Sequence, residues 1–247
     1  MDFIADKDYI QQLQVDCVIF GFEDKKLKVL LPKLRYVGGF YGLPSGFVHQ
    51  EEDLEEAAYR ILCKRTGIED IYLEQFYVFG KKVRKNKEFL DRLISLNPEL
   101  QVQSATFSTE YAWFTKRFVS IGYYALVDIH KVVPQKSDLD ESVEWYDIQS
   151  LPDLIMDHRD IVNKALLTLR RDLNEKINGF NLLPPTFTMR EVQRLYEAVF
   201  DQSFVRSNFQ QKMLSLGVLE RLGKKYTGAS NKAPYLYRFK QHNPEFH

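Results

Sequence analysis

The sequence predicts an α+β protein, with a body built around a mixed sheet and a smaller C-terminal domain of helices and a β-hairpin. Three observations predict this class. Two β-prone stretches, 11–31 and 117–128, flank a helix-patterned stretch at 52–66. A long amphipathic pattern at 157–177 runs into Gly, Asn and a Pro pair, which are typical of a linker. Two helical patterns and then two strand patterns follow.

The body begins with a hairpin. Residues 11–22 and 26–31 have strand composition, and Glu23-Asp24-Lys25 forms the turn between them. A loop at 32–40 contains the break Gly38-Gly39. We expect further strands at 71–79, 117–128 and 143–147, and a short helix at 86–97.

Two helices of the body are predicted by apolar spacing. In 52–66 one stripe is apolar, and Gly67 ends the helix as a C-cap. In 157–177 apolar side chains recur every three or four residues. The stripes are Leu54, Ala57, Ala58, Ile61 and Leu62 in the first helix, and Val162, Leu166, Leu169 and Leu173 in the second.

The C-terminal segment has the element order of a winged helix-turn-helix domain. Thr188 and Glu191 have the spacing of a capping box, which opens a helix with Val192, Leu195, Tyr196 and Val199 inward. A second helix over 203–216 places Phe209, Met213 and Leu216 inward and ends at Gly217. Strands at 218–222 and 234–239 then enclose a basic loop. We therefore divide the chain into a body (1–178), a linker (179–185) and a winged helix (186–247).

Charge is distributed unequally between these parts. The 247 residues carry 34 basic and 34 acidic side chains, a net charge of zero. Residues 184–247 contain ten Lys and Arg against five Asp and Glu, a balance of +5, which leaves 24 against 29, or −5, on the rest. A basic module on an acidic body indicates an anionic partner such as double-stranded DNA.

Other classes of protein are not favoured. Apolar runs are far shorter than the roughly 20 residues of a membrane span, and acidic residues stand where a signal peptide needs basic ones. Cys17 and Cys63 lie in apolar runs with no metal or redox spacing, so we expect buried free thiols. We therefore expect a cytoplasmic protein with no membrane contact.

Residues 43–68 carry the most informative motif. Gly46, Glu52, Arg60, Leu62, Gly67 and Ile68 match, over 23 residues, the spacing of Gly, Glu, Arg, aliphatic, Gly and aliphatic in one known motif. This motif is the box of the Nudix hydrolases, which the segment resembles. The resemblance implies a Nudix-fold α/β/α sandwich with a mixed sheet.

The departures from the box argue against catalysis. Its three helix carboxylates would stand at 61, 64 and 65, where this chain has Ile61, Lys64 and Arg65. These positions share one helix face, and Mg²⁺ requires oxygen ligands that they do not offer. We expect no catalytic residue, no metal and no cofactor. An alternative is a rearranged hydrolase that uses Glu52, Glu55 and Glu56, although Glu51, Glu52, Glu55 and Glu56 also fit a solvated first turn with a Glu56–Arg60 pair.

The resemblance extends beyond the box to nearly the whole chain. The residues that carry it are Leu151-Pro152, Asp157-His158, the 180–184 linker, Phe187-Thr188-Met189 and 235–239. Together they resemble the Nudix-related transcriptional regulators, which join a Nudix-like sensor to a winged helix. Known members sense ADP-ribose or arabinose. Residues from about 84 to 115 look like an insertion relative to this group, without an assigned role.

The predicted DNA-reading surface consists of polar residues on the second C-terminal helix and lysines of the wing. Arg, Asn and Gln read base edges, and lysines neutralise phosphates. A plain solvated face is the alternative. The residues are Arg206, Ser207, Asn208, Gln210, Gln211 and Lys212 on the helix, and Lys224, Lys225 and Lys232 in the wing.

The expected function is a ligand-responsive transcriptional regulator, a repressor of carbohydrate metabolism, that binds its operator as a homodimer. The effector pocket would include Arg35, Tyr41, Ser45, Lys64 and Arg65, with Lys64 and Arg65 as a solvated face in the alternative reading. A pentose is the first choice of effector and ADP-ribose the second. A protein-binding adaptor without DNA contact is the remaining alternative.

Three further features have open interpretations. His158 either orients a ligand or caps the helix that follows it. Trp113 and Phe114 either cover a pocket or form a dimer surface or a satellite core. Trp145 and Tyr146 are expected in the core and on the sheet face.

Overall fold

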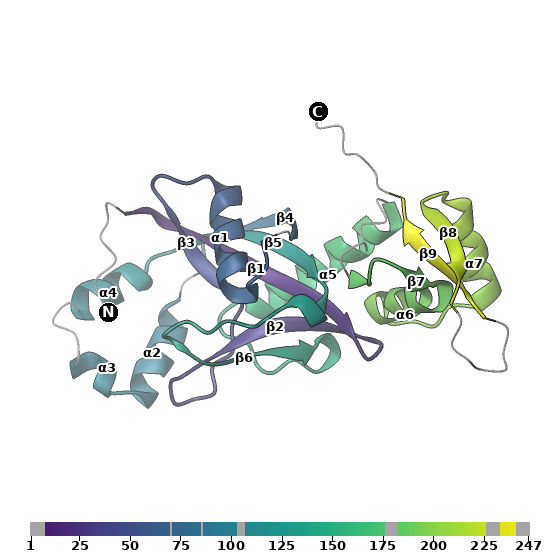
Figure 1. The fold of residues 1–247 in the computed structure, drawn as a ribbon. Helices are drawn as coiled ribbons and strands as arrows, with labels where there is room; N and C mark the ends of the chain where they lie inside the picture. The colour runs from purple at the N-terminus through teal and green to yellow at the C-terminus, as the bar shows by residue number, and fades with distance from the viewer. Residues whose placement is uncertain are drawn as a thin grey trace.

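A computed structural model of the chain confirms the α+β class and the winged-helix order (Figure 1). It describes residues 8–69, 71–84, 86–102, 107–175, 182–225 and 233–240. Within these ranges no helix combines the length and the apolar character needed to cross a membrane.

The body is built on a six-stranded mixed sheet of order β4-β5-β1-β2-β6, with β3 paired to β1. β1 runs parallel to β5 and antiparallel to β2 and β3. The strands are β1 (Tyr9–Glu23), β2 (Lys26–Leu34), β3 (Ser45–His49), β4 (Tyr72–Phe79), β5 (Val119–Val127) and β6 (Asp140–Asp147). The sequence did not predict β3, because its five residues lie in the box loop and do not alternate in polarity.

Helices cover both faces of this sheet. α1 (Leu54–Thr66) packs on the face that carries Val15, Cys17 and Ile19, and α5 (His158–Glu175) packs on the opposite face. Alternate residues of β1 therefore belong to different cores, as the two-residue strand period requires. Cys17 is buried as predicted, whereas Cys63 is only partly buried. Two short 3₁₀ helices, η1 (Ile129–Lys131) and η2 (Ile148–Ser150), border β6.

The segment predicted as an insertion forms a helical lobe at the end of the body that is far from the winged helix (Figure 1). It contains α2 (Lys87–Leu96), α3 (Glu99–Val102) and α4 (Phe107–Phe114), of which only α2 was predicted. Trp113 is 4% exposed and packs edge-on against Phe47 and Phe118. Of the interpretations offered for Trp113, the satellite core is therefore confirmed.

The C-terminal domain contains β7 (Phe187–Thr188), α6 (Met189–Phe200), α7 (Arg206–Ser215), β8 (Leu219–Lys224) and β9 (Tyr235–Phe239). Its sheet has the order β7-β9-β8. The capping box at Thr188 and Glu191 is present as predicted. The prediction that Leu216 points inward is wrong: α7 ends before it, and its side chain is 40% exposed.

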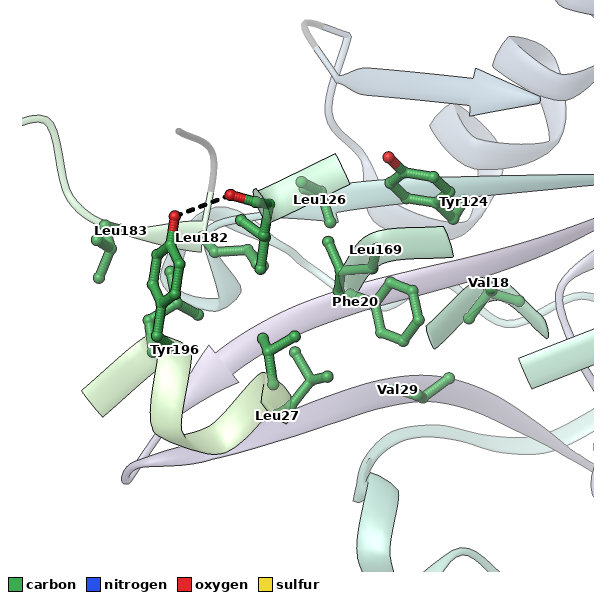
Figure 2. Close-up of a cluster of buried hydrophobic side chains, with 14 of the residues drawn as sticks. Val18, Phe20, Leu27, Val29, Tyr124, Leu126, Leu169, Leu182, Leu183 and Tyr196 are labelled. Carbon is green, nitrogen blue, oxygen red and sulfur yellow. Dashed lines mark hydrogen bonds between the residues drawn. The ribbon is translucent and has the colours of Figure 1, made fainter. Parts of the chain in front are cut away.

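The two domains share one hydrophobic core (Figure 2). Leu27 of β2, 1% exposed, belongs to the same buried cluster as Tyr196 of α6 and Leu169 of α5. Arg170 of α5 donates to the carbonyl of Val199 at 2.7 Å, and the Tyr196 hydroxyl donates to the carbonyl of Leu173 at 3.1 Å. The winged helix is therefore docked on the sheet. Residues 176–181, which include part of the predicted linker, lie outside the described ranges.

Candidate effector and DNA-binding sites

The face of α1 that resembles a metal site is filled by apolar packing at position 61. Ile61 is 4% exposed and lies directly beneath Gly46. A Cβ atom on Gly46 would come within 2.8 Å of the Ile61 Cδ1 atom, so the glycine of the box makes room for the isoleucine. The position that holds a carboxylate in the box motif has become part of the core.

Arg60 keeps its place in the box through an ion pair. Its guanidinium donates to both Glu52 carboxylate oxygens, at 2.8 and 2.6 Å, and to the carbonyl of Phe47 at 2.8 Å. The hydrogen bond from Arg60 lowers the pKa of Glu52. The predicted Glu56–Arg60 pair is wrong, because Glu56 instead accepts from the backbone of Asp53 as half of a capping box.

The two basic residues of the α1 face have different surroundings. Lys64 is exposed. Arg65 forms an ion pair with the buried Asp140 and also reaches the carbonyl of Gln135. Its guanidinium therefore ties α1 to the start of β6. Among the residues that the structure describes, no group of three or more His, Cys, Asp or Glu side chains is arranged to hold a metal ion.

The residues predicted to line the effector pocket lie in different environments. Arg35 is exposed and, like Arg65, borders the segment 135–140: its backbone N–H donates to Leu139. The ring of Tyr41 packs edge-on against Tyr146 with centroids 5.6 Å apart. Ser45 instead donates to Asp16 at 2.6 Å, in a buried polar cluster.

This polar cluster lies between β1 and the start of α5. Asp16, fully buried, accepts hydrogen bonds from four side chains: Gln14, Ser45, Ser120 and Arg84. Burial by itself raises the pKa of Asp16, but His158, Arg84 and the two serine hydroxyls outweigh it, so the pKa lies below its ordinary value of 3.8.

Arg84 and His158 complete the cluster. Arg84, with its side chain 6% exposed, donates to Asp157 at 2.7 Å and to Asp16 at 3.2 Å. Nδ1 of His158 accepts from the backbone N–H of Leu43 at 2.9 Å, which places the proton of the neutral ring on Nε2. Burial lowers the pKa of His158, and the nearby carboxylates Asp16 and Asp157 only partly oppose this.

Two buried atoms of this cluster have no hydrogen-bond partner among the described residues. They are Nε2 of His158 and Oδ1 of Asp157. Nε2 lies 4.0 Å from the Asp16 carboxylate, which is too far for a hydrogen bond. Neither Asp16 nor Arg84 was predicted as a site residue. Asp16 lies within an apolar strand, and Arg84 lies at the start of the apparent insertion, so neither belongs to a recognisable motif.

A cleft of about 1,360 Å³ opens beside this cluster. It lies between the end of β4, the residues that lead into α2, and the start of α5, and both Arg84 and Asp157 line it. Tyr77 and Phe79 contribute aromatic side chains. None of the five predicted pocket residues lines this cleft.

The predicted DNA-reading residues of α7 form its outer face. Phe209 and Met213 are buried, Gln210 is half-buried, and the other five predicted residues are exposed: Arg206, Ser207, Asn208, Gln211 and Lys212. The face therefore combines cations with amides, which are groups able to hydrogen-bond to base edges.

The wing carries a second group of cations. Lys224 lies at the end of β8 over the ring of Tyr235, 5.7 Å from its centroid, and Lys225 pairs with Glu191 at 3.5 Å. Arg221, which the sequence reasoning missed, is exposed beside the same ring. The pairing of β8 with β9 shifts in register between Arg221 and Lys224, so strand alternation would not have placed both cations at one ring. Lys232 lies outside the described ranges.

Comparison with known families shows to which family the body belongs. The NUDIX domain family matches residues 11–165, which is more than half of the chain. The chain belongs to the Nudix family. A second family, the NrtR DNA-binding winged helix domain, matches residues 179–239. Each of the two domains of this Nudix protein therefore matches a known domain family.

Similarity to known proteins extends over both domains. The Nudix chain is 28% identical to the "ADPR responsive transcriptional repressor NtrR" of Acinetobacter baylyi, over 97% of this chain and 86% of that protein. It is similar in fold to NrtR of Shewanella oneidensis in complex with a 27mer DNA (24% identity, TM-score 0.68, covering 93% and 94% of the two chains). It also resembles a MutT/nudix family protein from Enterococcus faecalis (19% identity, TM-score 0.67, covering 94% and 87%).

Proposed function

We propose that this protein is a DNA-binding transcriptional repressor that responds to a small molecule, and that its Nudix domain binds this molecule without hydrolysing it. One observation carries the proposal: a winged helix with an exposed, polar and cationic α7 face shares its hydrophobic core with the Nudix sheet. A change in the Nudix domain can therefore alter the position of α7.

The α7 face and the wing suit the two parts of DNA recognition. Asn208 and Gln211 offer amides to base edges, and Lys212 and Lys224 offer charge to phosphates. We propose that two chains bind as a homodimer, because two copies of α7 would then enter successive major grooves about 34–36 Å apart. Sedimentation with and without operator DNA tests the stoichiometry.

ADP-ribose is a better supported effector than a free pentose. The sequence favoured a pentose, on the ground that a box without metal ligands no longer needs a diphosphate. The Acinetobacter relative, matched over 97% of this chain, is named as responsive to ADP-ribose, and no relative reported above is named for a sugar. The effector preference is therefore revised in favour of ADP-ribose.

Loss of hydrolysis is part of the proposal. Ile61 is in the core, Lys64 is a cation, and Arg65 is bound to Asp140, so this helix face offers no carboxylate to a divalent ion. The rearranged hydrolase also loses support, because Glu52 is held by Arg60 and Glu56 by the Asp53 backbone.

DNA selection followed by binding measurements tests the function. The full chain would select duplexes from a random pool, and fluorescence anisotropy would compare the selected and scrambled duplexes with and without ADP-ribose or L-arabinose. We expect ADP-ribose to weaken operator binding by about 100-fold, which corresponds to roughly 2.7 kcal/mol of coupling. If the chain shows no preference for any duplex, or if no effector changes its affinity, the proposal is wrong.

A further inference from the structure

The cleft beside α5 has the chemical character of a sugar site. Four basic and four acidic side chains line it, so its formal charge is balanced. A balanced cleft offers little net attraction to a diphosphate, whose recognition favours clustered cations. Aromatic rings such as Tyr77 line the same cleft, and they provide flat apolar surfaces for the C–H groups of a sugar ring.

Arg84 and Asp157 supply donors and an acceptor at one point of this cleft. Arg84 uses three of its five N–H groups on Asp157, Asp16 and the Phe118 carbonyl, so two have no partner among the described residues. Oδ1 of Asp157 accepts no hydrogen bond from them either. A hydroxyl group donates and accepts at once, and so satisfies both residues. A diphosphate linkage carries no proton at neutral pH, so it accepts only and is repelled by the carboxylate.

The Asp157 carboxylate is reachable from the cleft. Its side chain is 29% exposed, although Oδ1 itself is covered. The terminal torsion of aspartate is soft, so a rotation about it can turn Oδ1 towards the cleft. Arg84, at 6% exposure, is fixed by two carboxylates and holds Asp157 in place through a 2.7 Å hydrogen bond.

We propose that this cleft recognises the hydroxyl groups of a sugar through Arg84 and Asp157. This inference rests on the proposed function and deepens it by identifying the part of the effector that is read. The proposal also gives the insertion a role, because Arg84 is the first residue of the segment predicted as an insertion. The hydroxyls can belong to the terminal ribose of ADP-ribose or to a free pentose.

Calorimetric titration of the full chain tests the proposal with ADP-ribose, D-ribose and L-arabinose, and with inorganic pyrophosphate as competitor. Asp157→Asn should weaken sugar binding at least tenfold. Asp160→Asn, which changes another acidic residue of the same cleft, is the matched control and should change affinity less than twofold. Binding of ADP-ribose alone identifies ADP-ribose as the source of the hydroxyls, and binding of a pentose identifies a free sugar.

Three results would overturn the proposal. They are equal effects of the two substitutions, displacement of a bound free pentose by pyrophosphate, and failure of all three sugar compounds to bind. Because Asp157→Asn could disturb the cluster, hydrogen exchange of the unmodified chain gives an independent readout. Protection on sugar binding should appear in β4, α2 and the first turns of α5. Protection confined to 35–45 and 61–68 would place the site at the box instead.

This test separates the inference from the proposed function. If the sugar changes operator binding while Asp157→Asn has no effect, the inference fails and the function stands. If the sugar binds through Asp157 but leaves DNA affinity unchanged, the site stands and the function as a repressor fails.

Discussion

His158 should make the stability of this protein depend on pH below 6.5. The ring is 2% exposed and neutral in the folded protein, with its Nδ1 atom accepting from Leu43. Burial lowers its pKa from the ordinary value of 6.5. As the pH falls below 6.5, the unfolded chain therefore gains a proton that the folded chain does not. The stabilising contribution is complete above pH 6.5 and is lost progressively below it.

The magnitude follows from one proton. Each pH unit between 6.5 and the lower, folded pKa of His158 should cost about 1.4 kcal/mol of unfolding free energy. His158→Asn keeps a side-chain acceptor near Leu43 and removes the titration, so this slope should disappear. Acidic groups with lowered pKa values, such as Asp16 and Glu52, act mainly below their ordinary values of 3.8 and 4.5, which lie below the pH range of this test.

Urea unfolding followed by tryptophan fluorescence at pH 7.5, 6.5 and 5.5 measures the effect. Trp113 and Trp145 report on the helical lobe and on the sheet. His130→Asn is the control, because the His130 side chain is 75% exposed. If His158→Asn and the unmodified chain lose stability equally between pH 6.5 and 5.5, the reasoning about the buried neutral ring is wrong.

Three other predictions follow from the structure. Lys224→Ala should weaken binding to operator and to scrambled DNA about equally, and should reduce the salt slope of binding by roughly one unit. Asn208→Ala should mainly reduce discrimination between the two duplexes. Fluorescence anisotropy across a salt series distinguishes these two effects. Leu27→Ala, in the core shared by both domains, should lower the unfolding free energy by about 2–5 kcal/mol, measured in urea. With Mg²⁺ or Mn²⁺ the protein should not cleave ADP-ribose; chelator-sensitive turnover near 1 per second or faster would contradict the loss of the metal face.

Much of the fold could be predicted because its elements are long and periodic. The stripe through Leu54 and Leu62 and the capping box at Thr188 are local signals, and both elements appear where they were expected. β3 and β7 were missed because each is defined by its pairing partner, β1 or β9, and not by its own pattern. The apolar pattern also predicted that the second C-terminal helix extends to Leu216 with this side chain inward, although the side chain is 40% exposed.

The candidate site was harder to predict, because its residues come from four distant segments. Asp16, Ser120, Arg84 and His158 meet only when β1, β5, the residues before α2 and the start of α5 are assembled. The spacing of the box predicts a functional role for its helix, and with it a role in ligand binding for Arg65. Its actual partner, Asp140, stands 75 residues away and gives no local signal.

α5 physically connects the two parts of the proposed function. It begins at His158 beside the cleft, and its eighteen residues give a rod of about 27 Å at 1.5 Å per residue. At its other end, Arg170 and Leu173 hydrogen-bond α6, and Figure 1 shows the helix reaching from behind the sheet to the winged helix. A ligand that binds its first turn acts on an element whose last turns already hold the DNA-binding domain. Close-packed interiors transmit such shifts because they have little free space. Under the proposed mechanism, hydrogen exchange should therefore detect the effector at both ends of α5, whereas a change limited to its first turn would require another route to α6.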